Sequence, residues 1–171
     1  FARQFCLSVA KGMNHFLDYG ISLTYNRALY IATEDDSHNS SFLLRKQMEG
    51  LHQSESENLS FIFADTLSNE EILLALDLHL VVVDSFGDIF QGTDTNNTMQ
   101  MRKNVRYFDY FAKKHQCFIL FVHHINKGAY HETPHQKNIM GGGGLTQKVR
   151  FAWQLTQGES GSKYLTVVKG N

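Results

Sequence analysis

Runs of hydrophobic residues along the chain predict strands, and helical patterns separate most of them. The clearest run is Leu80–Val83, four apolar residues of which three are β-branched, and it leads directly into Asp84 and Ser85. A run without polar alternation is typical of a strand buried on both faces of a parallel sheet. The stretches 28–33, 59–64 and 117–122 are also predicted to be strands.

Periodic spacing of apolar residues predicts the helices. Residues 1–19 place most of their large apolar side chains on one side of a helix. Within residues 101–112 the apolar positions step by four, three and four, which gives a second helix one buried face. Shorter helices are predicted over residues 42–48 and 68–78, the latter because it opens with a capping-box sequence.

The last part of the chain has a different pattern. Residues 149–155 and 164–168 predict two strands joined by a turn over residues 158–162, and residues 127–144 form the longest irregular segment. Strands that alternate with helices and end in a hairpin predict a three-layer α/β fold with a mostly parallel central sheet and a C-terminal β-hairpin.

Length and composition restrict the class of protein. With 171 residues and 42% hydrophobic content, the chain can form one well-buried domain but hardly two. No apolar run approaches the roughly 20 residues of a membrane span, and neither end carries a signal peptide, so we expect a cytoplasmic protein. The net charge of -1 gives no general attraction to nucleic acid, so any such binding needs a local basic patch. Cys6 and Cys117 lie in apolar segments and are predicted to be reduced, buried thiols.

Polar residues follow three of the predicted strands. Glu34, Asp84 and His124 lie at strand ends, where ligands of open α/β sheets bind. If these ends meet at one edge, they offer one carboxylate for Mg²⁺, a second for a water molecule and a polar sensor, which suits phosphate-ester hydrolysis. The alternatives are that Asp84 ends its strand in a simple turn, and that Glu34 begins a solvated acidic helix start.

The paired histidines His123 and His124 suggest a metal site, with His131 and His135 nearby. Successive strand residues point to opposite faces, and Pro134 disfavours the helix that two ligands four residues apart would need. A hydrogen-bonding role for one of the paired histidines is therefore favoured over metal ligation.

The four consecutive glycines Gly141–Gly144 do not match a phosphate-binding loop. Such a loop needs Lys-Ser or Lys-Thr directly after its last glycine, whereas Leu145 follows here. A flexible loop is the better interpretation, and it is flanked by the basic residues Lys127, His131, His135, Lys137, Lys148 and Arg150. This patch suits a nucleic-acid backbone, with an ordinary solvated loop as an equal alternative.

A set of motifs occurs in order along the chain: LYIATEDD, LVVVDSFGD, the loop over residues 92–97, ILFVHHINKG, KVRFAWQLT and VVKGN. As an ordered set they resemble the RecA-like ATPases, and most closely the RepA-type hexameric helicases of plasmids and mobile elements. The likeness spans nearly the whole chain, so residues 1–171 are identified as one RecA-like ATPase core.

The resemblance implies a role for each matching residue. Asp84 matches the Walker B aspartate that holds Mg²⁺ through water, with Ser85 beside it in the ATP site. Glu34 matches the glutamate that orients or deprotonates the attacking water, and His124 matches a sensor of the γ-phosphate. Arg150 and Lys169 match basic fingers that reach the ATP site of the neighbouring subunit, where they stabilise the transferred phosphoryl group.

The same resemblance implies that the glycine-rich region faces single-stranded DNA in the channel of a homo-oligomeric ring, a hexamer in this family. The residues implied in DNA binding are Lys127, Lys137, Gly141, Gly142, Gly143 and Lys148. The implied activity is Mg²⁺-dependent ATP hydrolysis coupled to DNA binding or unwinding, as in DNA replication. Two other interpretations stay open: a RecA-like subunit without ATP turnover that binds DNA or a partner, and a KaiC-like regulatory ATPase.

The chain departs from the family pattern in two places. It contains no GxxxxGK(S/T) loop, which in the family lies just before the helix that Phe1–Lys11 resembles, so we expect that loop upstream of residue 1. The paired basic residues at the last strand are half kept, with Lys169 present and Asn171 in the second place. Both ends are therefore expected to be cuts in a longer protein.

Overall fold

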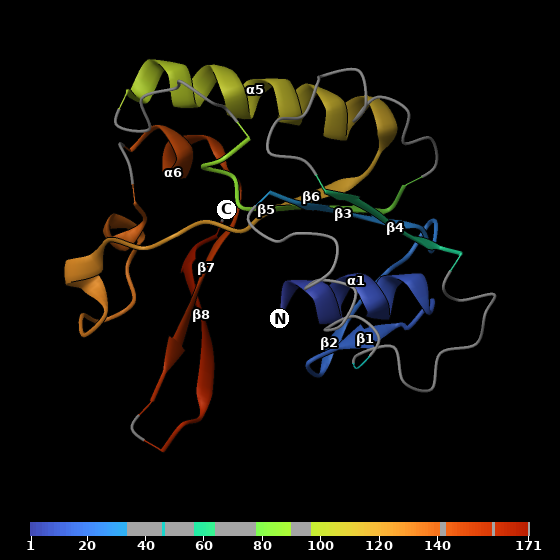
Figure 1. Cartoon of the computed structure of the whole chain (residues 1–171), viewed down its shortest axis with the longest axis horizontal. Coiled ribbons are helices and arrows are strands. Elements are labelled where there is room, and N and C mark those ends of the chain that lie inside the picture. Colours follow the sequence, from blue (N-terminus) through green and yellow to red (C-terminus); the bar gives the residue numbers. More distant parts are fainter. Residues whose placement is uncertain are drawn as a thin grey trace. The chain divides into compact units, whose positions relative to one another are not determined.

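The computed structural model of the chain describes residues 1–33, 46, 57–63, 78–89, 97–140, 143–158 and 160–170. The chain divides into two compact units, the first made of residues 1–91 and 110–122 and the second of residues 92–109 and 123–171. Figure 1 shows a mixed α/β architecture with a parallel sheet and a C-terminal antiparallel hairpin, which confirms the predicted fold class. Apart from Lys46 and Leu78, the helices predicted over residues 42–48 and 68–78 lie outside the described residues.

The first unit is built on a four-stranded parallel sheet with the strand order β4-β3-β5-β6. Its strands are β3 (Ala28–Ala32), β4 (Leu59–Phe63), β5 (Leu80–Asp84) and β6 (Phe118–Phe121). β3 and β5 lie in the middle and are buried along almost their whole length, which is why their sequences are continuous apolar runs. All four predicted strands are present, with their ends shifted by one residue at most.

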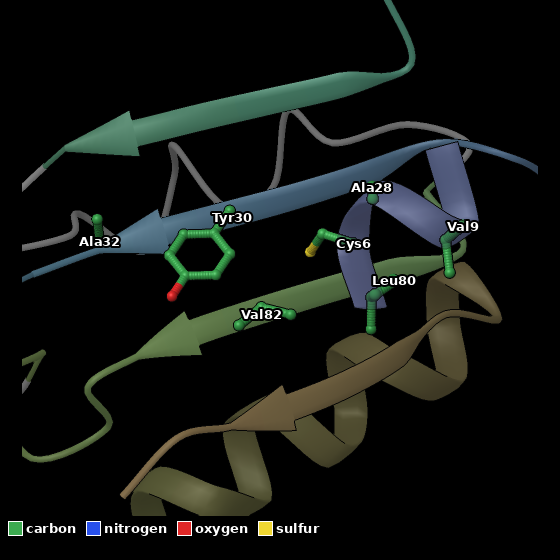
Figure 2. Packing of buried hydrophobic residues seen from close by; sticks show 7 residues of the cluster. All are labelled: Cys6, Val9, Ala28, Tyr30, Ala32, Leu80 and Val82. Atoms are coloured by element: carbon green, nitrogen blue, oxygen red, sulfur yellow. The ribbon is translucent and has the colours of Figure 1, made fainter. Parts of the chain in front are cut away.

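Helix α1 (Ala2–Ala10) covers one face of this sheet. A buried cluster joins the helix to the sheet and consists of Cys6, Val9, Ala28, Tyr30, Ala32, Leu80 and Val82 (Figure 2). The strand residues of the cluster are alternate positions, as expected for one face of a sheet. In Figure 2, Val9 lies beside the start of β5 and Cys6 lies farther along the sheet, so α1 runs opposite to the strands. Its N-terminal end is therefore directed toward the carboxyl ends of β3 and β5.

The opposite face of the sheet is covered by the second half of α5 (Thr98–His115), which gives the three layers (Figure 1). The boundary between the two units falls within this helix. The helix predicted over residues 101–112 is confirmed and begins earlier, because Asn97 Oδ1 accepts hydrogen bonds from the backbone N–H groups of Met99 (3.1 Å) and Gln100 (3.2 Å). Among the described residues, no helix is both long and apolar enough to cross a membrane.

The helix predicted over residues 1–19 stops about halfway, so this prediction is wrong for its second half. Gly12 adopts a φ of +67°. The backbone N–H groups of Gly12 and Met13 donate to the carbonyl oxygens of Val9 (2.8 Å) and Ser8 (3.0 Å). This hydrogen-bond pattern ends a helix at a glycine in the left-handed region.

A short hairpin follows α1 in place of the predicted helix. It pairs β1 (His15–Phe16) with β2 (Tyr19–Gly20) in antiparallel fashion, through a turn in which Leu17 and Asp18 both have positive φ. The ring of Phe16 packs against Phe1 at 5.4 Å and against Phe5 at 5.1 Å between centroids. The apolar residue that continues the helical spacing is thus buried by a turn of the chain back onto α1.

The second unit holds the first half of α5, three short helical segments and the C-terminal hairpin. The short segments are η1 (Lys127–Ala129), η2 (Gln136–Asn138) and α6 (Gly144–Lys148). The hairpin pairs β7 (Ala152–Gln157) with β8 (Lys163–Lys169), which confirms the predicted antiparallel hairpin. The first of these strands begins three residues later than predicted, because Val149 ends α6 as its C-cap.

Candidate functional site

Asp84 is the last residue of β5, where the central strands of the sheet end. It pairs with Ala32 across the sheet, and its place two residues after Val82 puts it on the face that α1 covers. The Asp84 side chain is half-buried, and its Oδ2 accepts a hydrogen bond from the hydroxyl of Tyr30. The strand end therefore presents an oriented carboxylate.

The environment of Tyr30 keeps its hydroxyl a donor. Burial raises the pKa of Tyr30, and so do the hydrogen bond to Asp84 and the negative charge of that carboxylate. The positive charge of Arg3, in the first turn of α1, acts in the opposite direction on the pKa of Tyr30. Arg3 thus acts electrostatically on this strand end, in keeping with the direction in which α1 runs.

The backbone beside Asp84 is joined to the end of β3 through Thr33. The Thr33 N–H donates to the carbonyl oxygen of Asp84 (2.7 Å), and the Ser85 N–H donates to Thr33 Oγ1 (2.7 Å). On the other side, the Phe86 N–H donates to the carbonyl oxygen of Val122 (2.9 Å). These bonds continue the sheet pairing past the last strand residue and hold the Asp84–Ser85 segment between its neighbours.

Ser85 itself is buried, and its hydroxyl donates to Asp88 Oδ2 within the following turn. The peptide bond between Asp84 and Ser85 is cis. Ser85 lies at the predicted strand end, and its predicted contact with nucleotide stays a prediction.

Glu34, the predicted partner of Asp84, lies outside the described residues, as do Gly141 and Gly142. His124 belongs to the second unit and is exposed; its carbonyl oxygen accepts a hydrogen bond from the Met140 N–H (3.0 Å). The neighbouring His123 has its Nε2 2.9 Å from the carbonyl oxygen of the same methionine. The roles assigned to Glu34 and His124 stay predictions.

The two predicted finger residues also belong to the second unit. Arg150 is exposed, whereas Lys169 is partly buried and its Nζ donates to the carbonyl oxygens of Thr146 (2.8 Å) and Val149 (2.7 Å). A lysine in this position satisfies carbonyl groups at the end of α6 and complements the negative end of that helix. Lys169 also lines a pocket of about 480 Å³ together with His135, Gln136, Lys137, Ile139, Gly143, Thr146 and Gln147.

The predicted DNA-binding lysines are exposed in the same unit. Lys127, Lys137 and Lys148 all have solvent-accessible side chains, and Gly143 precedes α6 as its N-cap residue. Lys137 pairs with Glu132 at 3.4 Å between Nζ and Oε2, and both side chains are at least half exposed. An exposed pair of this kind is weak, so it leaves Lys137 able to exchange its partner.

The site has the donor chemistry that Mg²⁺ requires. The described residues contain no cluster of three or more His, Cys, Asp or Glu side chains that would hold a metal by protein groups alone. Mg²⁺ typically keeps several waters and is held by one or two carboxylates together with substrate phosphates. A single oriented carboxylate at Asp84 fits that mode.

Two residues of this site were not predicted as functional, namely Tyr30 and Thr33. Both lie in a stretch that was assigned only to the core. The polar atoms of a tyrosine and a threonine near the end of a buried strand are a signal, because buried hydroxyl groups need partners. Their partners become apparent only once β3 is known to lie beside β5.

The sheet order, the helix on each face and the acidic end of β5 define a RecA-like P-loop ATPase fold. A profile of the AAA domain family matches residues 1–130, and the chain belongs to that family. Among solved structures, the fold is similar to one described as the ATPase domain of another protein, with a TM-score of 0.61 and 9% sequence identity. That match covers 84% of this chain and 66% of the solved ATPase domain, so the chain spans slightly less than two thirds of the domain that it matches. No curated protein matches the sequence.

Proposed function

We propose that the protein binds and hydrolyses ATP with Mg²⁺ at the carboxyl ends of β3 and β5. The observation that carries this proposal is the position of Asp84, at the end of β5 on the sheet face that α1 covers, with the N-terminal end of α1 directed toward the same edge. ATPase domains of this fold use such an edge for a magnesium nucleotide.

The electrostatics of α1 support the binding of phosphate groups. The first turn of α1 contains no acidic residue, and the N-cap residue Phe1 makes no side-chain capping hydrogen bond. The positive end of the helix dipole is therefore not offset by a carboxylate, and Arg3 adds a full positive charge. A triphosphate is attracted to this end while its metal ion is attracted to Asp84.

Each proposed catalytic residue has one task. Bound Mg²⁺ supplies neutralisation of charge on the phosphates. Asp84 accepts hydrogen bonds from water molecules of the ion, and Glu34 orients or deprotonates the attacking water. His124 senses the γ-phosphate, while Arg150 and Lys169 act on the ATP site of the neighbouring subunit.

We further propose that the subunits form a homo-oligomeric ring, a hexamer, that binds single-stranded DNA, as in RepA-type helicases of plasmids and mobile elements. Support comes from the exposed lysines Lys127, Lys137 and Lys148, which concentrate positive charge in the second unit of a chain whose net charge is -1. Ring assembly would bring the basic fingers of one subunit to the nucleotide of the next. DNA-stimulated ATPase activity would separate this function from that of a KaiC-like regulator.

The test is Mg²⁺-dependent ATP hydrolysis by the protein and by its Asp84→Asn variant. This change keeps the size of the side chain and removes its charge, so we expect turnover to fall about 100-fold or more. Asp18→Asn is the matched control, because Asp18 is exposed and its positive φ is tolerated by asparagine. Turnover in Asp84→Asn equal to that of the control would contradict the proposal. ATP binding without turnover in the unaltered protein would favour the inactive RecA-like scaffold instead.

A further inference from the structure

We infer that Tyr30 is a positioning residue for the magnesium nucleotide: its hydroxyl holds the carboxylate of Asp84 in the orientation that receives the waters of the ion. The inference rests on the proposed function of the strand end. The structural basis is the hydrogen bond from the Tyr30 hydroxyl to Asp84 Oδ2, between neighbouring strands of the parallel sheet.

The register of β3 and β5 explains how the two side chains meet. Tyr30 pairs with Val82, and Asp84 pairs with Ala32, so the tyrosine lies diagonally behind the carboxylate on the same sheet face. Diagonal neighbours are about 7–8 Å apart at their backbones, a span that an aromatic side chain can bridge. Ala32, the residue directly opposite Asp84, is small and leaves the space that the phenol ring needs.

The ring of Tyr30 is fixed by its surroundings. Its exposed fraction is 3%, and it belongs to the buried cluster shown in Figure 2, with Cys6 of α1 on the same face of the sheet. Its ring centroid also lies 5.7 Å from that of Phe61 on β4. A ring held on several sides has little rotational freedom, so its single polar atom is directed at one place.

The direction of the hydrogen bond matters for the chemistry. A phenol that donates to one carboxylate oxygen restrains the rotation of the carboxylate, and a hydrogen bond to an ionised acceptor is strong. An ion held through water depends on that orientation, because its contact with the protein passes through flexible hydrogen bonds. Loss of the hydroxyl should therefore weaken metal-dependent nucleotide binding while the fold and the charge of Asp84 stay in place.

Tyr30→Phe removes the hydroxyl and keeps the ring, and Tyr19→Phe is the matched control, because Tyr19 lies in the same unit and is 77% exposed. We would measure binding of Mn²⁺, as a spectroscopic probe for Mg²⁺, in the presence of a non-hydrolysable ATP analogue. The Mn²⁺ concentration for half-saturation should rise about tenfold in Tyr30→Phe and stay unchanged in the control. In hydrolysis assays, the Mg²⁺ requirement should rise by a similar factor, with a smaller change in kcat at saturating Mg²⁺.

Thermal unfolding and a double mutant separate a positioning role from a purely structural one. In the Asp84→Asn background, Tyr30→Phe should have no further effect on Mn²⁺ binding, because the restrained carboxylate is already gone. A lowered Tm of Tyr30→Phe with unchanged Mn²⁺ binding would overturn this inference and leave the proposed function intact. If the unaltered protein bound no Mn²⁺–nucleotide, the proposed function and this inference would both fail.

Discussion

The backbone N–H of Ser85 donates a 2.7 Å hydrogen bond to the side-chain oxygen of Thr33, and both residues are buried. This bond joins the end of β3 to the residue after Asp84. It uses a side chain where the strand pairing of the backbone has ended. The position of the proposed catalytic carboxylate therefore depends on a threonine that follows the neighbouring strand.

Replacement of Thr33 by valine should destabilise the protein by about 1–3 kcal/mol, because the shape is kept while the buried Ser85 N–H loses its acceptor. Urea unfolding at pH 7 measures the change. Thr33→Ser keeps the oxygen and should cost less than valine. Thr24→Val, at an exposed position of the same unit, serves as the control and should be nearly neutral. Equal stabilities of the valine and serine variants would show that the hydroxyl has no structural importance.

Gly12→Ala should destabilise the protein by about 1–2 kcal/mol, because φ at this position is +67° and a Cβ there is strained. Crowding does not contribute, since the nearest atom to an added Cβ would be Asn26 Cβ at 4.0 Å. Gly20→Ala is the matched control: it has no atom within 4 Å of an added Cβ and no positive φ. Unfolding midpoints of the two variants would be compared, and an equal loss in both would contradict the role of the left-handed helix end.

The strands of the sheet could be predicted from the sequence because burial on both faces leaves a local pattern. Leu80–Val83 is apolar at every position, and only a strand in the middle of a covered sheet needs that. The same reasoning failed after Gly12, because Phe16 continues the helical spacing of apolar residues although it reaches the core through a hairpin. Spacing shows that a residue is buried but does not show by which path.

The candidate site was predictable only in part, for a related reason. Asp84 follows its strand directly, so the sequence alone places it at a strand end. Tyr30 becomes part of the site through the register between β3 and β5, which depends on contacts between segments about fifty residues apart. The bonds from Lys169 to Thr146 and Val149 likewise depend on how β8 lies against α6.

The thiol of Cys117 should react slowly in the folded protein. Burial raises the pKa of Cys117 to about 11, so about one thiol in 1,000 is ionised at pH 8, against about one in four for a free cysteine. Burial raises the pKa of Cys6 as well. A disulfide reagent should label neither thiol rapidly at pH 8 and both in urea, with glutathione as the reference thiol. Fast labelling under native conditions would contradict the burial of both residues.

The same shift makes stability depend on pH in a defined window. The unfolded chain loses thiol protons near about pH 8.5 while the folded chain keeps the proton of Cys117 until about pH 11. The folded state then holds more protons than the unfolded state, so this contribution is complete below about pH 8.5 and is lost as pH rises toward 11. Urea unfolding of Cys117→Ala should show a weaker fall in stability over this window than the unaltered protein.

Lys169→Met should destabilise the second unit by about 1.5–3 kcal/mol, because two carbonyl groups at the end of α6 lose a charged donor. Amide hydrogen exchange should speed up in α6 more than in α1, which belongs to the other unit. Lys163→Met, at the exposed start of β8, is the control and should leave exchange in α6 unchanged. If Lys169 acts as a finger in an assembled ring, it must give up these bonds when it reaches a phosphate.

Replacement of Lys127 and Lys137 by glutamine should flatten the salt dependence of single-stranded DNA binding. Each phosphate contact contributes about 0.7 to the slope of log K against log salt for single strands, so loss of two contacts should lower the slope by about 1.4. Lys103→Gln combined with Lys163→Gln removes the same charge from exposed positions of the same unit outside the glycine-rich region. Fluorescence anisotropy with a labelled oligonucleotide, over a range of salt concentrations, gives both slopes. An equal decrease in the two double variants would indicate a general effect of charge, and an unchanged slope in the first would place the DNA on another surface.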